Sequence, residues 1–246
     1  DLDSKSDEII RPILRGRDIQ KYTYKFADLY LLFIPWHFPL HQNKEIKGSS
    51  DLAENEFKKQ FPAIYNHLLQ FKKQLSNRNR AETGIRYEWY ALQRWGSNYF
   101  EDFAKPKITY IEIMTDNPSE GYEFPAFSYD TEKCVALNTA YIMTGNEYEL
   151  KYIMAVLNST LGKQLVKYYV VQLQQRQYRM LGQYVANFPI PKLDSNEYIF
   201  IANLISEILY KKEKGEEFKE LETLIKNKVY SIFNLNQEEV DFIETQ

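Results

Sequence analysis

A chain of 246 residues with 44% hydrophobic residues and a net charge of −3 can fold as one large domain or as a domain with an appendage. Its single cysteine, Cys134, excludes an intramolecular disulfide and favours a reducing cytoplasm. No apolar run approaches the length of a membrane span, and the acidic start DLDSKSDE differs from a signal peptide. We therefore expect a cytoplasmic protein with no membrane partner.

Basic residues are segregated from acidic ones along the chain. Residues 198–246 carry six basic and ten acidic side chains, and residues 1–10 carry one and four, so residues 11–197 have a net charge of +4. The excess lies in three islands: residues 11–25, 72–94 and 163–192. The last island holds five cations and no acid. Such segregation suits a phosphate-binding face, because each contacted phosphate needs a nearby cation.

Apolar periodicity predicts strands and then a helix in the first third of the chain. Strand formers at residues 19–26 and an apolar run at 29–36 favour strands, and we expect the second to be buried. Six apolar residues then recur at spacings of 4, 3, 4, 3 and 4, as on one face of a helix: Phe57, Phe61, Ile64, Leu68, Phe71 and Leu75. Pro62 fits if it opens a second helical piece, and we expect this helix to cover a sheet.

Strands and helices alternate in the middle of the chain. Strands are expected at residues 107–113, 124–129 and 134–137, and the residue types of 116–121 predict a turn. Helices are expected at Glu147–Leu157 and at residues 161–170. The sequence therefore predicts a mixed α/β domain with flanking helices.

The end of the chain predicts a helical hairpin. Asp194 is typical of a helix N-cap, with Glu197 three residues later, and Leu235 and Asn236 with Glu239 repeat the pattern. Two apolar stripes lie on either side of Gly215: Ile201, Leu204, Ile205 and Ile208, then Phe218, Leu221, Ile225 and Ile232. Two such helices should form an antiparallel hairpin, a spacer or docking segment. The predicted domains are residues 1–192 and this hairpin, residues 193–246.

The sequence contains none of the catalytic motifs sought. GxGxxG, the phosphate-binding P-loop and GxSxG do not occur. Pro39 lies between His37 and His41 and argues against the helix that would join them in a metal site. Cys134 has no histidine nearby in the sequence, so we interpret it as a buried thiol. We expect no catalytic residue and no metal site.

Five short segments occur in a recognisable order. They are RPILRGRDI (residues 11–19), WY followed by QR (89–94), YF followed by KPKI (99–108), LNS (157–159) and FPIP (188–191). The series resembles the TaqI-like C-terminal specificity domain, the target-recognition part of Eco57I-type restriction-modification methyltransferases. The resemblance covers roughly residues 9–192, and the tail resembles the helical segment that follows in such enzymes.

This resemblance implies a bacterial, type IIG-like module that reads double-stranded DNA for a methyltransferase domain or subunit lying upstream. S-adenosylmethionine and Mg are then expected only in the absent catalytic domains, and no cofactor is expected in this chain. The methyltransferase motifs themselves are missing here, so we expect the chain to be non-catalytic on its own.

Basic side chains near the start of the chain are candidate phosphate ligands. Arg15, Arg17 and Lys21 surround Gly16, where the backbone can turn tightly, so their side chains can clamp phosphates. The alternative for Arg17 is a structural ion pair with a carboxylate.

The stretch WYALQRWGSNYF (residues 89–100) is either core or a contact surface. If it is extended, its side chains alternate between two faces. We expect Leu92 and Trp95 to be mainly core, and Gln93 and Arg94 to be candidates for DNA contact.

The strongest candidate for base reading is QLQQRQYR, because Arg pairs with the guanine edge and Gln with adenine. The candidate residues are Gln172, Gln174, Gln175, Arg176, Tyr178 and Arg179, without an acid among them. The alternative is a solvated polar loop or helix face. Lys163 is expected to bind phosphate, and so are Lys105 and Lys107, although Lys-Pro-Lys can simply start a strand.

We expect a non-catalytic, sequence-specific binder of duplex DNA. Phosphate contacts would set its position, and the Gln/Arg loop would select bases in the major groove. Two alternatives stay open: a protein-interaction module without DNA contact, and a remnant catalytic subunit that needs its missing half.

Overall fold

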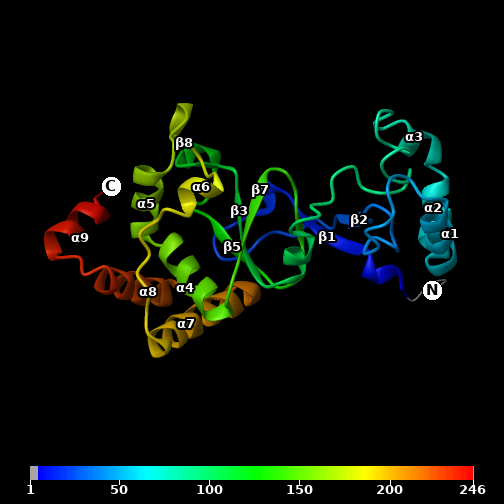
Figure 1. Ribbon diagram of the computed structural model, residues 1–246. Coiled ribbons are helices and arrows are strands. Elements are labelled where there is room, and N and C mark those ends of the chain that lie inside the picture. Colours follow the sequence, from blue (N-terminus) through cyan, green and yellow to red (C-terminus); the bar gives the residue numbers. More distant parts are fainter. Residues whose placement is uncertain (1–4, 246) are drawn as a thin grey trace. The chain divides into compact units, whose positions relative to one another are not determined.

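The chain folds into two compact units, which we describe separately. The computed structural model describes residues 5–245, except for the side chain of Gln175 (Figure 1). The first unit comprises Asp1–Pro12 and Leu29–Asp102, and the second comprises Ile13–Asp28 and Phe103–Gln246. Helices combine with small mixed and antiparallel sheets, which confirms the mixed α/β class. The predicted boundary at residue 192 is not the division between these units.

The described part of the first unit contains three short α-helices, the strand β2 (Tyr30–Leu32) and the first residues of β1 (Ile10–Leu14). α1 (Asp51–Gln60) begins after Ser50, whose side chain accepts a hydrogen bond from the amide of Ala53, and α2 (Pro62–Leu69) begins with Pro62. α3 (Lys72–Ser76) follows. The predicted helix with a break at Pro62 is confirmed. These first residues of β1 pair antiparallel with β2.

Aromatic rings make up the core of the first unit. Phe57 and Phe61 pack with Trp89 and Tyr90, and all four side chains are buried. The segment around Trp89 is irregular rather than extended, so the condition for an alternation of its side chains is not met. The helices pack on these rings and not on a sheet as predicted. In the stretch of residues 89–100, Trp89, Tyr90 and Ala91 therefore belong to the core.

Two strand predictions in the first thirty-six residues are corrected. The run at 29–36 contributes only β2, an edge strand whose Tyr30 side chain is exposed, so the expectation of a buried strand is wrong. Residues 19–26 form isolated bridges instead of a strand, with Tyr22 in the left-handed region at φ 72°.

β3 (Lys107–Ile111) is the central strand of the main sheet in the second unit. It pairs antiparallel with β5 (Phe127–Asp130) and with β7 (Ala140–Thr144). β6 (Val135–Ala136) pairs in parallel with the last two residues of β1, and β4 (Ile113–Thr115) pairs antiparallel with β8 (Gln177–Arg179). The three predicted strands are confirmed. The sequence does not predict β7, because its residues are uniformly half-buried and show no alternation.

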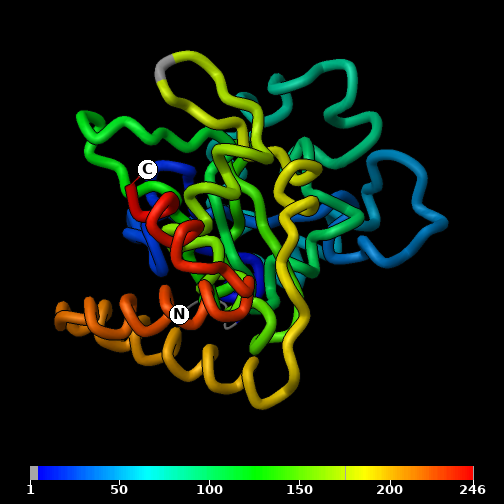
Figure 2. Tube along the Cα trace, turned by 90° about the vertical axis from the view of Figure 1, so that its left-hand side faces the viewer, coloured from blue at the N-terminus to red at the C-terminus, as the bar shows by residue number. Residues whose placement is uncertain are grey.

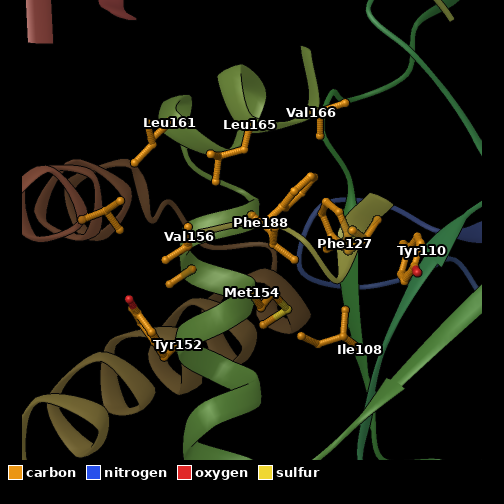
Figure 3. Packing of buried hydrophobic residues seen from close by; sticks show 14 of the residues in the cluster. Ile108, Tyr110, Phe127, Tyr152, Met154, Val156, Leu161, Leu165, Val166 and Phe188 are labelled. Atoms are coloured by element: carbon orange, nitrogen blue, oxygen red, sulfur yellow. The ribbon is translucent and has the colours of Figure 1, made fainter. Parts of the chain in front are cut away.

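α4 (Glu147–Leu157) lies at the centre of the second unit's core. Most of its circumference is buried because β3 and β5 contact it on one side and α7 (Ser195–Lys214) on another. Figure 3 shows Met154 of α4 beside Ile108 of β3, with Phe127 and Phe188 in the same cluster. α5 (Thr160–Tyr169) begins after its cap Ser159, and both helices agree with the prediction.

The C-terminal helices belong to this same core. Figure 2 shows α7 and α8 (Lys219–Ile232) side by side and antiparallel, as predicted for a hairpin, and the two helices contact each other. Asp194 caps α7, which ends at Gly215 in the left-handed conformation, and Asn236 forms a capping box with Glu239 at α9 (Gln237–Glu244). The apolar stripe of α7 packs into the cluster that contains Ile108. No helix within residues 5–245 has the length and apolar character to cross a bilayer.

Candidate nucleic-acid interface

The ribbon formed by β4 and β8 is the base of the candidate site. Its three facing pairs are Ile113 with Arg179, Met114 with Tyr178, and Thr115 with Gln177. Neighbouring residues of a strand point to opposite faces. The central pair is buried in the hydrophobic core. Gln177 and Arg179 therefore lie on the outward face of the ribbon.

The Tyr178 side chain faces the hydrophobic core. Its side chain is only 5% exposed, and its ring stacks on Phe124 with the centroids 5.3 Å apart. The prediction that Tyr178 meets DNA is wrong, because the alternation along β8 turns it inward between two outward residues.

Three cations surround one carboxylate at the end of the ribbon, a group that we call the Asp116 cluster (Asp116, Lys163, Lys167 and Arg176). The Nη2 atom of Arg176 lies 2.8 Å from Oδ2 of Asp116, and the ammonium nitrogens of Lys167 and Lys163 lie 3.4 and 3.8 Å from its carboxylate. The amide of Asp116 also donates to the carbonyl of Arg176, which has φ 62°. Main-chain and side-chain contacts together hold this unusual backbone conformation.

The Asp116 cluster carries an excess of positive charge. Burial opposes ionisation of Asp116, but the hydrogen bond from Arg176 and the charges of Lys163, Lys167 and Arg176 outweigh it, so the pKa of Asp116 is lowered. With the carboxylate ionised, three cations face one anion. A phosphate group is a natural further anion for this cluster.

Arg179 is paired with Glu112, which lies between β3 and β4. Its guanidinium donates two hydrogen bonds to Oε1 of Glu112, at 3.2 and 3.1 Å. The Arg179 side chain is nevertheless 51% exposed, and that of Arg176 is 55% exposed. The run of residues 172–179 has no acid of its own, but Glu112 and Asp116 oppose it in space.

A cavity of about 460 Å³ lies beside the outward face of the ribbon. Arg17 and Gln177 both line it, although they are far apart in the sequence. The predicted turn at 116–121 forms another part of its wall, with η4 (Pro118–Glu120) ending at Gly121 in the left-handed region. Arg17 is exposed, and no carboxylate among the described side chains forms an ion pair with it. The structure thus brings Arg17 and the Gln/Arg segment to one surface.

Arg15 and Lys21 have structural partners instead. Arg15 donates to both carboxylate oxygens of Asp18, which is 5% exposed, and this hydrogen bond lowers the pKa of Asp18. The ion pair considered for Arg17 therefore belongs to Arg15. The ammonium group of Lys21 lies 2.5 Å from Glu222 of α8. Neither contact is with the ribbon.

Lys105 and Lys107 lie at the other end of the β3–β4 segment. Lys107 is completely buried, with its ammonium nitrogen 2.5 Å from Asp130. The hydroxyl of Tyr24 and the amide of Cys134 also donate to Asp130. The expectation that Lys107 binds phosphate is therefore wrong, whereas Lys105 is exposed.

The remaining candidates are exposed or half-buried. Arg94 is exposed in the first unit and donates to Glu82 at 3.0 Å, while Gln93 is half-buried. Leu92 and Trp95, expected to be core, are half-buried as well. In the second unit Gln172 and Gln174 are exposed, and the side chain of Gln175 lies outside the described residues.

Cys134 is the buried thiol that the sequence predicts. Its side chain is 1% exposed, and burial raises the pKa of Cys134 to about 12. A thiol in this state is a poor nucleophile.

Three residues of the site were not singled out from the sequence: Glu112, Asp116 and Lys167. Lys167 follows Lys163 by four residues, so the helical period alone would place both on one face of α5. The two acids carry no comparable local signal, because their partners are distant in the sequence.

The ribbon with its basic cluster occurs in a chain that belongs to a family of specificity domains. Residues 11–190 match the TaqI-like C-terminal specificity domain, which covers most of the chain. Membership of this family supports a DNA-recognition role in restriction-modification.

Two curated methyltransferases are similar to the chain. Type II methyltransferase M.MjaIV of Methanocaldococcus jannaschii is 24% identical over 239 residues, which is 96% of this chain and 72% of the relative. Type II methyltransferase M.BanIII of Aneurinibacillus aneurinilyticus is 25% identical over 173 residues, which is 68% of this chain and 28% of the relative. The chain thus spans different shares of these two proteins, and both contain sequence outside the match.

Proposed function

We propose that the second unit reads the sequence of duplex DNA through the β4–β8 ribbon and is non-catalytic on its own. The observation that carries this proposal is the outward face of the ribbon. It presents Gln177 and Arg179, with the Asp116 cluster at its end and Arg17 in the lining of the adjoining cavity.

A two-stranded ribbon fits the major groove of B-DNA, where each base pair has its own pattern of donors and acceptors. Arg179 has the guanidinium that pairs with guanine, and Gln177 has the amide that pairs with adenine. Lys163 and Lys167 on α5, with Arg176, would then lie against phosphates and set the register. Arg17, which lines the adjoining cavity together with Gln177, adds a further cation.

The carboxylate partners of the arginines are compatible with this role. Exposed ion pairs contribute little to stability because water screens them. A phosphate or a guanine edge can therefore replace Glu112 as the partner of Arg179 at small cost. The side chain of Arg15 is only 28% exposed beside Asp18, whereas that of Arg176 is 55% exposed, so Arg15 is not part of the proposed contact set.

The proposed partner is a methyltransferase domain or subunit of a type IIG-like restriction-modification enzyme. The relatives are named methyltransferases, and each contains chain beyond the match. S-adenosylmethionine and Mg would act in that other part. The β4–β8 ribbon would select the DNA sequence on which the catalytic part acts.

Selection from a random duplex pool tests this function with the chain as it exists. Bound duplexes should be enriched in one short motif, and the affinity should fall steeply with salt because phosphate contacts release counterions. The variant Arg179→Gln should lose part of the motif. The proposal fails if the chain does not bind duplex DNA at low salt, or if Arg179→Gln selects the same motif with the same strength.

A further inference from the structure

A groove between α5 and α9 lies on a different face of α5 from the Asp116 cluster. Gln164, Leu165 and Tyr168 line it from α5, and Phe242 lines it from α9, around a volume of about 540 Å³. α5 and α9 contact each other and are neighbours in Figure 1. At 100° per residue, the mean direction of Lys163 and Lys167 lies roughly 130° around α5 from that of Gln164, Leu165 and Tyr168. An occupant of the groove would therefore not compete with an anion at the Asp116 cluster.

Large apolar rings stand open at the rim of this groove. Tyr168 is 70% exposed and Phe242 is 50% exposed, whereas Leu165 at the base is buried. Aromatic side chains of this kind supply most of the binding energy at protein interfaces.

The charged side chains that line the groove are acidic. Glu238 and Glu239 line it, and no cation is found among its described lining residues. The helix α9, QEEVDFIE, contains no base, and of its four acids Glu244 is paired with Lys226 of α8. A partner that lies along α9 should therefore be basic, since like charges across an interface are unfavourable.

Gln164 gives an independent indication of a missing partner. Its side chain is 5% exposed, yet its Nε2 atom has no hydrogen-bond partner among the described residues. A buried amide donor that lacks an acceptor is costly, and such groups are rare in folded proteins. The last torsion of Gln is soft, so a small rotation can turn this donor toward an acceptor in the groove.

We propose that the groove binds an amphipathic helix of a partner protein. Its apolar face would cover Tyr168 and Phe242, lysines or arginines would lie beside Glu238 and Glu239, and one polar side chain within the apolar face would accept from Gln164. A helix fits because both walls are helices, as in other helix-in-groove complexes. This interaction goes beyond DNA reading and does not depend on it.

The test uses the whole chain and a fluorescein-labelled helical peptide made of Leu, Lys and one central Ser. A matched peptide has Glu in place of every Lys. The Lys peptide should bind in fluorescence anisotropy, and the Glu peptide should bind at least about tenfold more weakly. Phe242→Ser should weaken the Lys peptide at least about tenfold. Tyr148→Ser on α4, where the ring is similarly exposed but outside the groove, should leave affinity unchanged.

Two further variants test charge and the buried amide. Glu238→Lys should weaken the Lys peptide and strengthen the Glu peptide. Replacing the central Ser of the peptide by Ala should matter for the unmodified protein but not for Gln164→Leu, which isolates this pair in a double-mutant cycle.

Three outcomes would overturn the proposal. One is that neither peptide binds, another is that both bind equally, and the third is that Tyr148→Ser is as harmful as Phe242→Ser. A dimer in light scattering that Phe242→Ser dissociates, without peptide binding, would show that a second copy occupies the groove. Duplex binding by all these variants should stay unchanged, so failure here is distinguishable from failure of the DNA proposal.

Discussion

Two aspartates bind cations in contrasting ways: Asp130 of β5, which faces the start of β3, and Asp116, which follows β4. Asp130 and Lys107 are both completely buried and form a one-to-one pair, with further donors from Tyr24 and Cys134. Asp116 faces three cations whose side chains are partly exposed, among them Arg176. The first arrangement is neutral and closed, and the second is cationic and open.

This difference shows which ion pairs indicate binding. A cation that has a carboxylate partner is not thereby excluded from a functional site, and a cation in a basic segment is not thereby included in one. What matters is whether positive charge exceeds negative charge locally and whether the cation reaches the surface. The charge of Lys107 is balanced by Asp130, and its side chain is buried. Arg176 and Lys163 share one carboxylate with a third cation, and their side chains are partly exposed.

The largest expected effect is the loss of stability when the buried pair of Lys107 and Asp130 is broken. Lys107→Met removes one partner of a buried ion pair and leaves Asp130 charged without it, so the free energy of unfolding should fall by about 3–5 kcal/mol. Urea denaturation followed by circular dichroism measures this change. The adjacent exposed variant Lys105→Met should stay within about 0.5 kcal/mol of the unmodified protein. Similar losses for both variants would contradict the distinction between a closed and an open end.

At the open end, the largest expected effect is on base preference. Arg179→Gln should reduce discrimination at one base position by roughly 5- to 100-fold, which corresponds to one bidentate pair. Its stability should be nearly unchanged, since only an exposed contact to Glu112 is lost. Competition between the selected duplex and single-base variants measures the discrimination. Equal losses at every position would assign Arg179 to the phosphates instead.

A smaller and different effect is expected for a phosphate ligand. Lys163→Gln should weaken all duplexes alike and reduce the slope of log affinity against log salt by about 1. Titration at several salt concentrations, with selected and unrelated duplexes, separates this behaviour from that of Arg179→Gln. A loss confined to the selected duplex would show that Lys163 contributes to base reading.

Much of the fold follows from local signals in the sequence. α4 and α7 begin where the caps place them, since Asn146 and Asp194 each accept amide hydrogen bonds of the first turn. The break at Pro62 follows from the geometry of proline. β7 is missed because strand periodicity requires one exposed face, and its residues are half-buried throughout.

The candidate site follows from the sequence only in part. Arg176 and Arg179 are found from residue type, but their partners Asp116 and Glu112 are 60 and 67 residues away and flank β4. Tyr178 cannot be assigned to a face, because a strand of three residues is too short to show which side is buried. The choice between Arg15 and Arg17 likewise depends on the buried position of Asp18.

The smallest expected effect is the change in duplex affinity when Asp116 is neutralised. Asp116→Asn keeps a hydrogen-bond acceptor for Arg176 but raises the local excess of positive charge by one. Duplex affinity should therefore rise by about threefold to tenfold, with a steeper salt dependence. Filter binding at two salt concentrations measures both. Unchanged affinity would mean that the Asp116 cluster does not face DNA.

The same substitution has a pH signature that is independent of DNA. The pKa of Asp116 is lower in the folded protein than its ordinary value of 3.8, because Arg176, Lys163 and Lys167 outweigh the effect of burial. Its charged form therefore stabilises the fold above about pH 4, and this contribution is lost as the pH falls through the lowered pKa. Below that range the two proteins should converge in stability, because protonated Asp and Asn are both neutral. Thermal unfolding from pH 7 down to pH 2 should show the unmodified protein losing its advantage over Asp116→Asn only in acid. An advantage that is constant across this range would mean that the carboxylate charge is not what holds Lys163, Lys167 and Arg176 together.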